Sequence, residues 1–193
     1  MELYRMSKVK NVGTERTMAD VGDRMHFTLD GGEEAEAIAI ERKENGMLFI
    51  FTDCLKDEFR LHKPGKYPGW EDCELREKLN GEILERFPED VLRLLMPFGN
   101  GDLLRIPTEK EIFGENKYGE EESEDVKQFE IMKDQRNRIA FQGFRTGAWE
   151  WYWLQNRGVY SATGAALVYG SGDATGRYAS YVLGVRPLFI ADL

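Results

Sequence analysis

Apolar and polar positions alternate between residues 21 and 53, and the pattern predicts three strands joined by tight turns. Residues 21–29 alternate loosely and end at Asp30-Gly31-Gly32, a turn signal. Residues 35–41 alternate again before Asn45-Gly46, the strongest hairpin signal in the chain. The apolar run MLFIFT that follows is typical of a buried strand. We therefore expect a β-meander here.

Further along, apolar positions recur at helical spacing. Leu75, Leu79 and Ile83 fall on one face of a predicted helix. Asp72 can cap this helix, and Gly81 weakens its last turn.

Two more helices are predicted from their termini. In FPEDVLRLLM, Pro88 suits a first-turn position and is followed by acidic residues at the positive end of the helix dipole. In IPTEKEIFG, Thr108 and Glu111 form a capping box, and Gly114 is a natural stop.

The last quarter of the chain is poor in charge and rich in glycine and tyrosine, which predicts short strands with glycine-rich turns. VRPLFIADL predicts a closing strand, in which Pro187 indicates an edge position or a bulge. Strands, then helices, then strands indicate an α+β domain whose first and last strands share one sheet. We divide the chain into residues 1–20, an N-terminal tail or edge strand, and residues 21–193, a single α+β domain.

The charge balance limits the partners. The 193 residues carry a formal net charge of -9, which repels phosphate backbones, so we expect no nucleic-acid partner. The start lacks the apolar core of a signal peptide, and no apolar run reaches the roughly 20 residues that cross a bilayer. We therefore expect a cytoplasmic protein without a membrane partner.

Two further features of the composition, an acidic run and two cysteines, predict no functional site. Residues 115–125 are densely acidic and predict a solvated loop or a helix start, since they lack the spacing of a calcium loop. Cys54 and Cys73 stand alone, so we expect two half-buried thiols rather than a zinc knuckle or a disulfide.

Candidate chemistry is sparse. GSGDATG follows a predicted strand, but its spacing is not that of a dinucleotide or P-loop motif, and a hairpin loop is favoured. His26 and His62 lie in no nucleophile pattern, and no His/Cys/Asp cluster is visible. We predict no catalytic residue, no metal site and no cofactor.

Three of the four tryptophans alternate. Trp149, Trp151 and Trp153 point to one face of a strand if the spacing is that of a strand. They either close the core or form an aromatic platform that stacks on a ligand. The core is favoured for Trp153, which leads into Leu154, and the platform has its best case at Trp149, near a loop.

Several short motifs occur in the order found in an uncharacterised domain family of Gram-positive bacteria and their phages. Two of them, YWLQN at 152–156 and GVRPLFI at 184–190, resemble its Trp-Leu-Arg-Ser and Gly-Val-Arg-Pro ending. The others resemble its opening strand, its Trp-x-x-Ser-x-x-Arg-x-x-Leu-Asn helix and its Pro-Ser/Thr-x-x-Glu segment: VGDRMHF at 21–27, GWEDCELREKLN at 69–80 and IPTEKEIFG at 106–114. The resemblance covers most of the chain from residue 21.

The chain departs from that family at three positions. Gln155 and Asn156 stand where the family usually has Arg and Ser, and Cys73 replaces the helix Ser. A neutral Gln cannot make the charge-assisted pair of an Arg, so a role of that arginine is not carried over.

The ending also resembles C-type-lectin-like folds, including the formylglycine-generating-enzyme group and phage receptor-binding variable proteins. This resemblance implies a mixed or antiparallel sheet with N- and C-terminal strands together and two or three short helices. The enzyme group uses a C-terminal cysteine pair, but no cysteine follows Cys73. The Glu-Pro-Asn and Trp-Asn-Asp motifs of true C-type lectins are also missing.

Structural roles are predicted for four residues: Trp70, Arg76, Trp153 and Arg186. Arg186, in the Gly-Val-Arg-Pro strand, is expected under the tryptophan face or beside a buried carboxylate, locking the terminal strand to the core.

We predict a non-enzymatic recognition module, in which the variable segment between Asn156 and Gly184 presents loops on a rigid sheet to a protein or glycan ligand. It could be phage- or prophage-associated, with a place in the phage particle. The alternatives are a hydrolase or modifying enzyme built from carboxylates and His62, and a structural assembly component. The oligomeric state is left open. The candidate binding residues are Trp149, Trp151, Tyr160, Tyr169, Arg177, Tyr178 and Tyr181.

Overall fold

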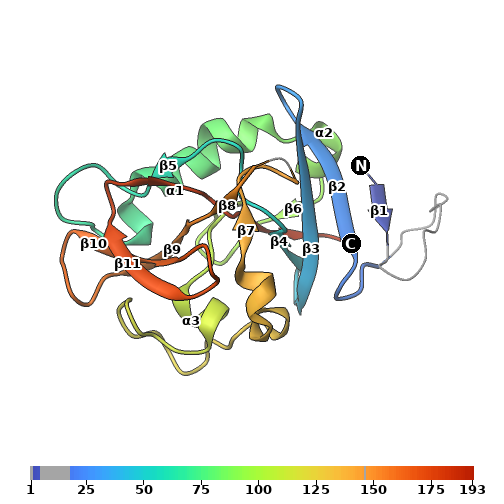
Figure 1. Cartoon of the computed structure of the whole chain (residues 1–193). Coiled ribbons are helices and arrows are strands. Elements are labelled where there is room, and N and C mark those ends of the chain that lie inside the picture. The colour runs from blue at the N-terminus through green and yellow to red at the C-terminus, as the bar shows by residue number, and fades with distance from the viewer. Residues whose placement is uncertain (1, 5–17, 146) are drawn as a thin grey trace.

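Antiparallel sheets dominate the computed structural model, which describes residues 2–4, 18–145 and 147–193. Of the chain, 34% is strand and 19% is helical, so the sheets carry the core and the helices are short (Figure 1). The largest sheet curls into a half-barrel with strand order β1-β2-β3-β4-β13-β6. Its strands are β1 (Glu2–Tyr4), β2 (Arg24–Leu29), β3 (Glu33–Lys43), β4 (Gly46–Phe51), β6 (Leu95–Met96) and β13 (Leu188–Ala191). This arrangement confirms a mixed α+β class.

The predicted meander is confirmed as β2-β3-β4, paired antiparallel throughout. The second turn is displaced by one residue from the Asn45-Gly46 prediction: Lys43 pairs with Gly46, and Glu44 and Asn45 form the turn. Gly46 opens β4 with φ 148°, and a Cβ there would collide with the carbonyl oxygen of Ala191. The glycine is therefore required by the approach of β13 rather than by the turn.

The closing strand joins the N-terminal meander, as predicted, because β13 pairs with β4 on one side and β6 on the other. The edge position predicted from Pro187 is wrong. Pro187 precedes the strand and causes no β-bulge in it, and its carbonyl accepts the N–H of Phe51. The missing proline donor is therefore left outside the strand, and β13 can lie inside the sheet.

Residues 1 and 5–17 of the predicted N-terminal tail lie outside the described residues. Glu2–Tyr4 pairs antiparallel with β2 at the edge of the sheet. None of the helices in the described part of the chain is long and apolar enough to cross a bilayer.

Three smaller sheets complete the part of the molecule that the structure describes, and all are antiparallel. The three-stranded sheet has the order β11-β10-β9, with β9 (Tyr152–Arg157), β10 (Gly164–Val168) and β11 (Ala174–Tyr178). The two-stranded sheets are β5 (Phe59–Arg60) with β12 (Val182–Leu183), and β7 (Ala140–Phe141) with β8 (Trp149–Glu150). The glycine-rich stretch GSGDATG spans the β10–β11 turn and the start of β11, which confirms the hairpin prediction.

The helices are shorter than predicted. They are α1 (Glu74–Lys78), α2 (Glu89–Leu92) and α3 (Glu109–Phe113), with 3₁₀ helices at Trp70–Asp72, Leu84–Arg86, Glu130–Lys133 and Gln135–Arg138 and a π-type turn at Leu79–Ile83. The capping box of Thr108 and Glu111 and the left-handed Gly114 are confirmed at α3.

Three details at the other helices differ from the predictions. Cys73, not Asp72, caps α1, since its Sγ accepts the N–H of Arg76 at 3.4 Å. The chain leaves helical geometry at Gly81, at φ -118° and ψ -107°, so the predicted long helix breaks into turns. Pro88 is the N-cap of α2 rather than a residue of its first turn.

The core consists of two clusters, one on each face of the sheets. In β4, Phe49 belongs to one cluster, and Leu48 and Ile50 belong to the other. β9 splits in the same way, with Trp153 in the first cluster and Tyr152 in the second. Burial on both faces explains why β4 reads as an unbroken apolar run.

Candidate functional site

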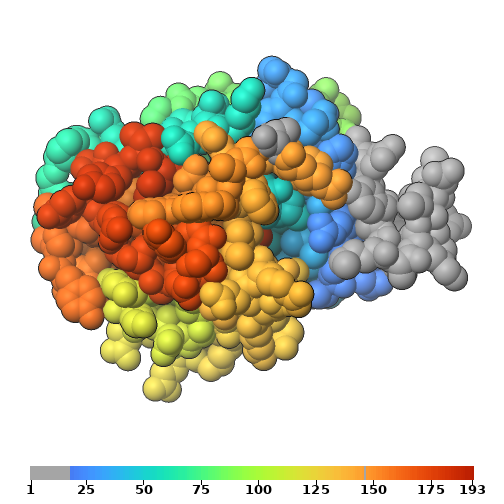
Figure 2. Space-filling view, viewed as in Figure 1, coloured from blue at the N-terminus to red at the C-terminus, as the bar shows by residue number. Residues whose placement is uncertain are grey.

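A hollow walled by tyrosines lies on the β10–β11 hairpin. Its volume is about 350 Å³, and we call it the tyrosine hollow; its walls are the rings of Tyr118, Tyr160, Tyr178 and Tyr181. The rings meet edge to face in two pairs, Tyr118 with Tyr160 at 6.2 Å and Tyr178 with Tyr181 at 5.9 Å between centroids. Figure 2 shows the C-terminal quarter of the chain, in orange and red, spread across the face toward the viewer.

Glycines form the floor of the tyrosine hollow. Gly164 lies opposite Tyr178, and Gly176 lies opposite Ala166, so both glycines face the same side of the hairpin. A Cβ at Gly176 would lie 3.7 Å from the ring of Tyr118. The absence of two side chains therefore makes the space that the tyrosine rings surround.

A buried carboxylate positions Tyr118. Glu109, at the start of α3, is fully buried. Its Oε1 accepts the N–H of Tyr118 at 3.0 Å, and its Oε2 accepts the N–H of Gly119 at 2.7 Å. Sequence reasoning missed both Glu109 and Tyr118. The available signal was a single aromatic residue before a glycine inside the acidic run.

The acidic run is a loop, one of the two predicted forms, and most of its residues are exposed. It is tied down by amides, which the prediction of a solvated surface did not include. The carboxylate of Glu122 accepts hydrogen bonds from Asn116 and Asn156, both at 2.8 Å. Asn156 also accepts the N–H of Glu109 at 2.7 Å. Asn156 thus holds the loop of Tyr118 against β9.

The remaining candidate binding residues gather around Trp151, and one of them, Arg177, also lines the tyrosine hollow. Tyr169 lies 4.3 Å from Trp151 and 6.2 Å from Trp149 between ring centroids, and the guanidinium of Arg177 lies 5.1 Å from the ring of Trp151. We call these four residues the tryptophan cluster. Trp149, Tyr169 and Arg177 are exposed. The seven predicted binding residues therefore form two groups, and Arg177 belongs to both.

The three tryptophans grade from surface to core. Trp149 is 53% exposed, Trp151 is half-buried, and Trp153 is fully buried with its Nε1 donating to the carbonyl of Phe59 at 2.9 Å. The strand is interrupted at Trp151, between β8 and β9. The three tryptophan side chains therefore lie in different environments despite their alternate spacing.

Arg186 is buried, but not with the predicted partners. Its guanidinium donates to the carbonyls of Phe51 at 2.7 Å, Asn137 at 2.9 Å and Thr52 at 3.1 Å. It also lies 5.4 Å from the ring centroid of Tyr152, rather than under the tryptophans. No ion pair joins it to a carboxylate among the described residues.

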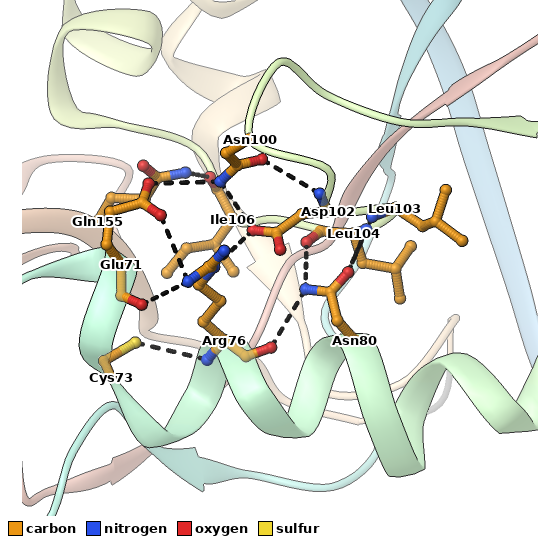
Figure 3. Close-up of polar contacts among 10 residues, drawn as sticks. All are labelled: Glu71, Cys73, Arg76, Asn80, Asn100, Asp102, Leu103, Leu104, Ile106 and Gln155. Carbon is orange, nitrogen blue, oxygen red and sulfur yellow. Dashed lines mark hydrogen bonds and ion pairs between the residues drawn. The ribbon is translucent and has the colours of Figure 1, made fainter.

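Trp70 and Arg76 lie at the start of the helical segment. Trp70 is buried in the core. Arg76 donates to Asp102 at 2.7 Å and to the carbonyl of Glu71 (Figure 3). In the same network, Asn80 accepts the N–H of Leu104 at 3.0 Å. These contacts tie α1 to the loop before α3.

Gln155 makes only hydrogen bonds between neutral groups in the described part of the chain. Its Nε2 donates to the carbonyl of Ile106 at 2.6 Å (Figure 3). Its backbone carbonyl accepts the hydroxyl of Tyr67 at 2.9 Å. The position joins the loop before α3 to β9 without a charge.

The groups needed for an enzymatic alternative are dispersed. His62 is buried, and its Nδ1 accepts the N–H of Glu74 at 3.4 Å. Cys54 and Cys73 are free and fully buried rather than half-buried, and burial raises the pKa of the Cys73 thiol to about 11. No group of three metal-liganding side chains occurs among the described residues.

One carboxyl titrates near neutrality. Burial, and then a hydrogen bond with the carboxyl of Glu58, raise the pKa of Glu150 to about 7. In the folded chain Glu150 keeps a proton that the unfolded chain has released, so stability is expected to fall as pH rises from about 4.5 to 7. Because Glu150 is partly exposed, solvent screening limits the loss to about 1 kcal/mol.

Urea unfolding at pH 5 and pH 7.5 measures this effect. The Glu150→Gln variant is expected to lose that part of the pH dependence, whereas Glu85→Gln, on an exposed turn, should show the same fall in the free energy of unfolding between the two pH values as the wild type. If Glu150→Gln also shows the wild-type fall, the assignment to Glu150 is wrong.

Residues 45–193 match a family described as a domain of unknown function (DUF6273). No curated protein and no solved structure matches the chain. The match begins at the β3–β4 turn and therefore leaves out VGDRMHF, one of the motifs behind the resemblance. The matched range includes all four tyrosines of the tyrosine hollow, the tryptophan cluster and the closing strand. Since the match spans more than half of the sequence, the chain belongs to the DUF6273 family.

Proposed function

We propose that the protein is a recognition module that binds its ligand in the tyrosine hollow. The observation that carries the proposal is the set of four tyrosine rings around a glycine floor. A volume of about 350 Å³ falls within the range of small-ligand and side-chain pockets. Tyrosine suits such a wall, because it offers a large contact area for few rotatable bonds.

The scaffold supports binding more than bond-making chemistry. The hollow lies on a hairpin whose β10 is buried along its whole length, so its loops stand on a rigid base. Among its lining residues Arg177 is the one charged side chain, and none is a carboxylate, a thiol or an imidazole. We extend the proposal to a C-type-lectin-like arrangement, in which the closing strand β13 joins the N-terminal strands in the six-stranded sheet and a separate three-stranded sheet presents the variable hairpin.

Filling the hollow tests the proposal. Gly176→Leu places a side chain toward Tyr118 without removing a contact, and Gly99→Leu makes the same change in an open loop. We would screen the wild-type chain against defined synthetic peptides and defined saccharides, then measure the best binder by calorimetry. Gly176→Leu is expected to weaken binding at least tenfold, while Gly99→Leu leaves it unchanged.

Two results would refute the proposal. One is equal affinity of the wild type and Gly176→Leu for the selected binder. The other is a screen in which neither peptides nor saccharides bind the wild-type chain.

A further inference from the structure

The outer edge of β11 is open. β11 is the edge strand of its sheet. The N–H of Ala179 donates to Thr163, and the N–H of Tyr169 donates to Asp173, so pairing with β10 uses the odd-numbered residues of the second strand. The backbone groups of Ala174, Gly176 and Tyr178 therefore point away from β10.

Most of the outward acceptors are already engaged, but the outward donors are not. The carbonyl of Tyr178 accepts the N–H of Tyr181, and the carbonyl of Gly176 accepts Nη1 of Arg177 at 2.9 Å. The N–H groups of Ala174, Gly176 and Tyr178 have no acceptor among the described residues. They are two positions apart on an extended strand, the repeat at which an added strand presents its carbonyls.

Arg177 supplies a charge beside these donors. It is exposed, lines the tyrosine hollow, and has no carboxylate partner in the described part of the chain. Its guanidinium instead lies against Trp151 and caps the carbonyl of Gly176. A carboxylate would pair with this cation by charge-assisted hydrogen bonds and draw it off that carbonyl, which would free a further backbone group of the edge.

We propose that β11 binds an extended acidic peptide segment of a partner protein as an added strand. The peptide accepts main-chain hydrogen bonds from Ala174 and Gly176, places a carboxylate on Arg177, and inserts an apolar or aromatic side chain into the tyrosine hollow. The inference rests on the proposed function. A saccharide would use the tyrosine rings but has no two-residue repeat of carbonyls, and a second copy of this chain would bring another arginine rather than a carboxylate.

Proline and alanine at one position separate the main-chain contact from the space. Gly176→Pro and Gly176→Ala add similar bulk at the floor, but only the proline removes the outward N–H, and it leaves the pairing with β10 intact. The probes are ten-residue synthetic peptides with acidic and aromatic residues, and their Glu→Gln and Asp→Asn counterparts. The full chain is expected to bind the acidic peptide, with Gly176→Pro about tenfold weaker than Gly176→Ala.

Two further measurements do not depend on the folding of the proline variant. N-methylation of single peptide amides should abolish binding at every second position, as expected for one edge of an added strand. Arg177→Gln should weaken the acidic peptide about tenfold and leave the neutral peptide unchanged.

Equal affinities of Gly176→Pro and Gly176→Ala, both folded by circular dichroism, would overturn the inference. So would N-methylation without alternation, or self-association through β11 seen by light scattering. A third outcome is that the chain binds a saccharide but no peptide, and that Gly176→Leu abolishes the saccharide binding. This result would refute the inferred peptide ligand and leave the proposed function supported.

Discussion

Replacing Arg186 with methionine is expected to lower the free energy of unfolding by about 4 kcal/mol. Arg186 is 3% exposed and holds the carbonyls of Phe51, Thr52 and Asn137. Methionine fills part of the space but donates nothing, and each abandoned buried acceptor costs about 1–3 kcal/mol. The loss is measured by urea unfolding at neutral pH.

The matched control is an arginine in contact with one neighbour at the surface. Arg136 pairs with Asp134 at the start of the 3₁₀ helix Gln135–Arg138, with its side chain 87% exposed. Arg136→Met should leave the unfolding midpoint unchanged, since exposed ion pairs contribute little. A loss below 1 kcal/mol in Arg186→Met would show that the three hydrogen bonds from Arg186 to these carbonyls are not needed for stability.

The second large effect is expected at Trp153. The ring is fully buried and its Nε1 donates to Phe59, so Trp153→Ala opens a cavity and leaves that carbonyl unpaired. Changes of this kind cost about 3–5 kcal/mol. Differential scanning calorimetry and urea unfolding measure the loss.

Trp149 provides the control, because it is the same residue type four positions earlier with an exposed ring. Trp149→Ala is expected to cost clearly less than Trp153→Ala, since about half of the Trp149 side chain is already exposed to water. Similar losses in the two variants would mean that Trp149 is held as firmly as Trp153.

The local elements were predictable where a few neighbouring residues decide them. The capping box at Thr108 and the left-handed Gly114 need only the first and last turns of α3, and both are confirmed. The meander from β2 to β4 was predictable because side-chain alternation and turn residues act over a few positions.

Errors arose where a distant segment changed the local preference. Gly46 is needed because Ala191 approaches it, so the hairpin turn lies one residue earlier than the dipeptide indicated. Pro187 precedes an interior strand, because β6 covers the other edge of β13. Neither Ala191 nor β6 is visible from the sequence around these residues.

The candidate site was predictable only in part. Tyr160, Tyr178 and Tyr181 were found from the composition of the last quarter, and they line one hollow. Tyr118 was not predicted, because it lies in the acidic loop. The hydrogen bond from its N–H to the buried carboxylate of Glu109 positions it at the hollow. The tryptophan spacing gave a shared direction, but burial of each ring depends on what packs over it.

The sequence by itself determined the α+β class, the meander, the third helix and the glycine-rich hairpin, because period, caps and turn residues act between near neighbours. Tertiary structure alone decided which tryptophan is buried, where the guanidinium of Arg186 finds its acceptors, and that glycines of β10 and β11 form a floor beneath Tyr118. Those outcomes depend on contacts between segments far apart in the chain, which no local pattern records.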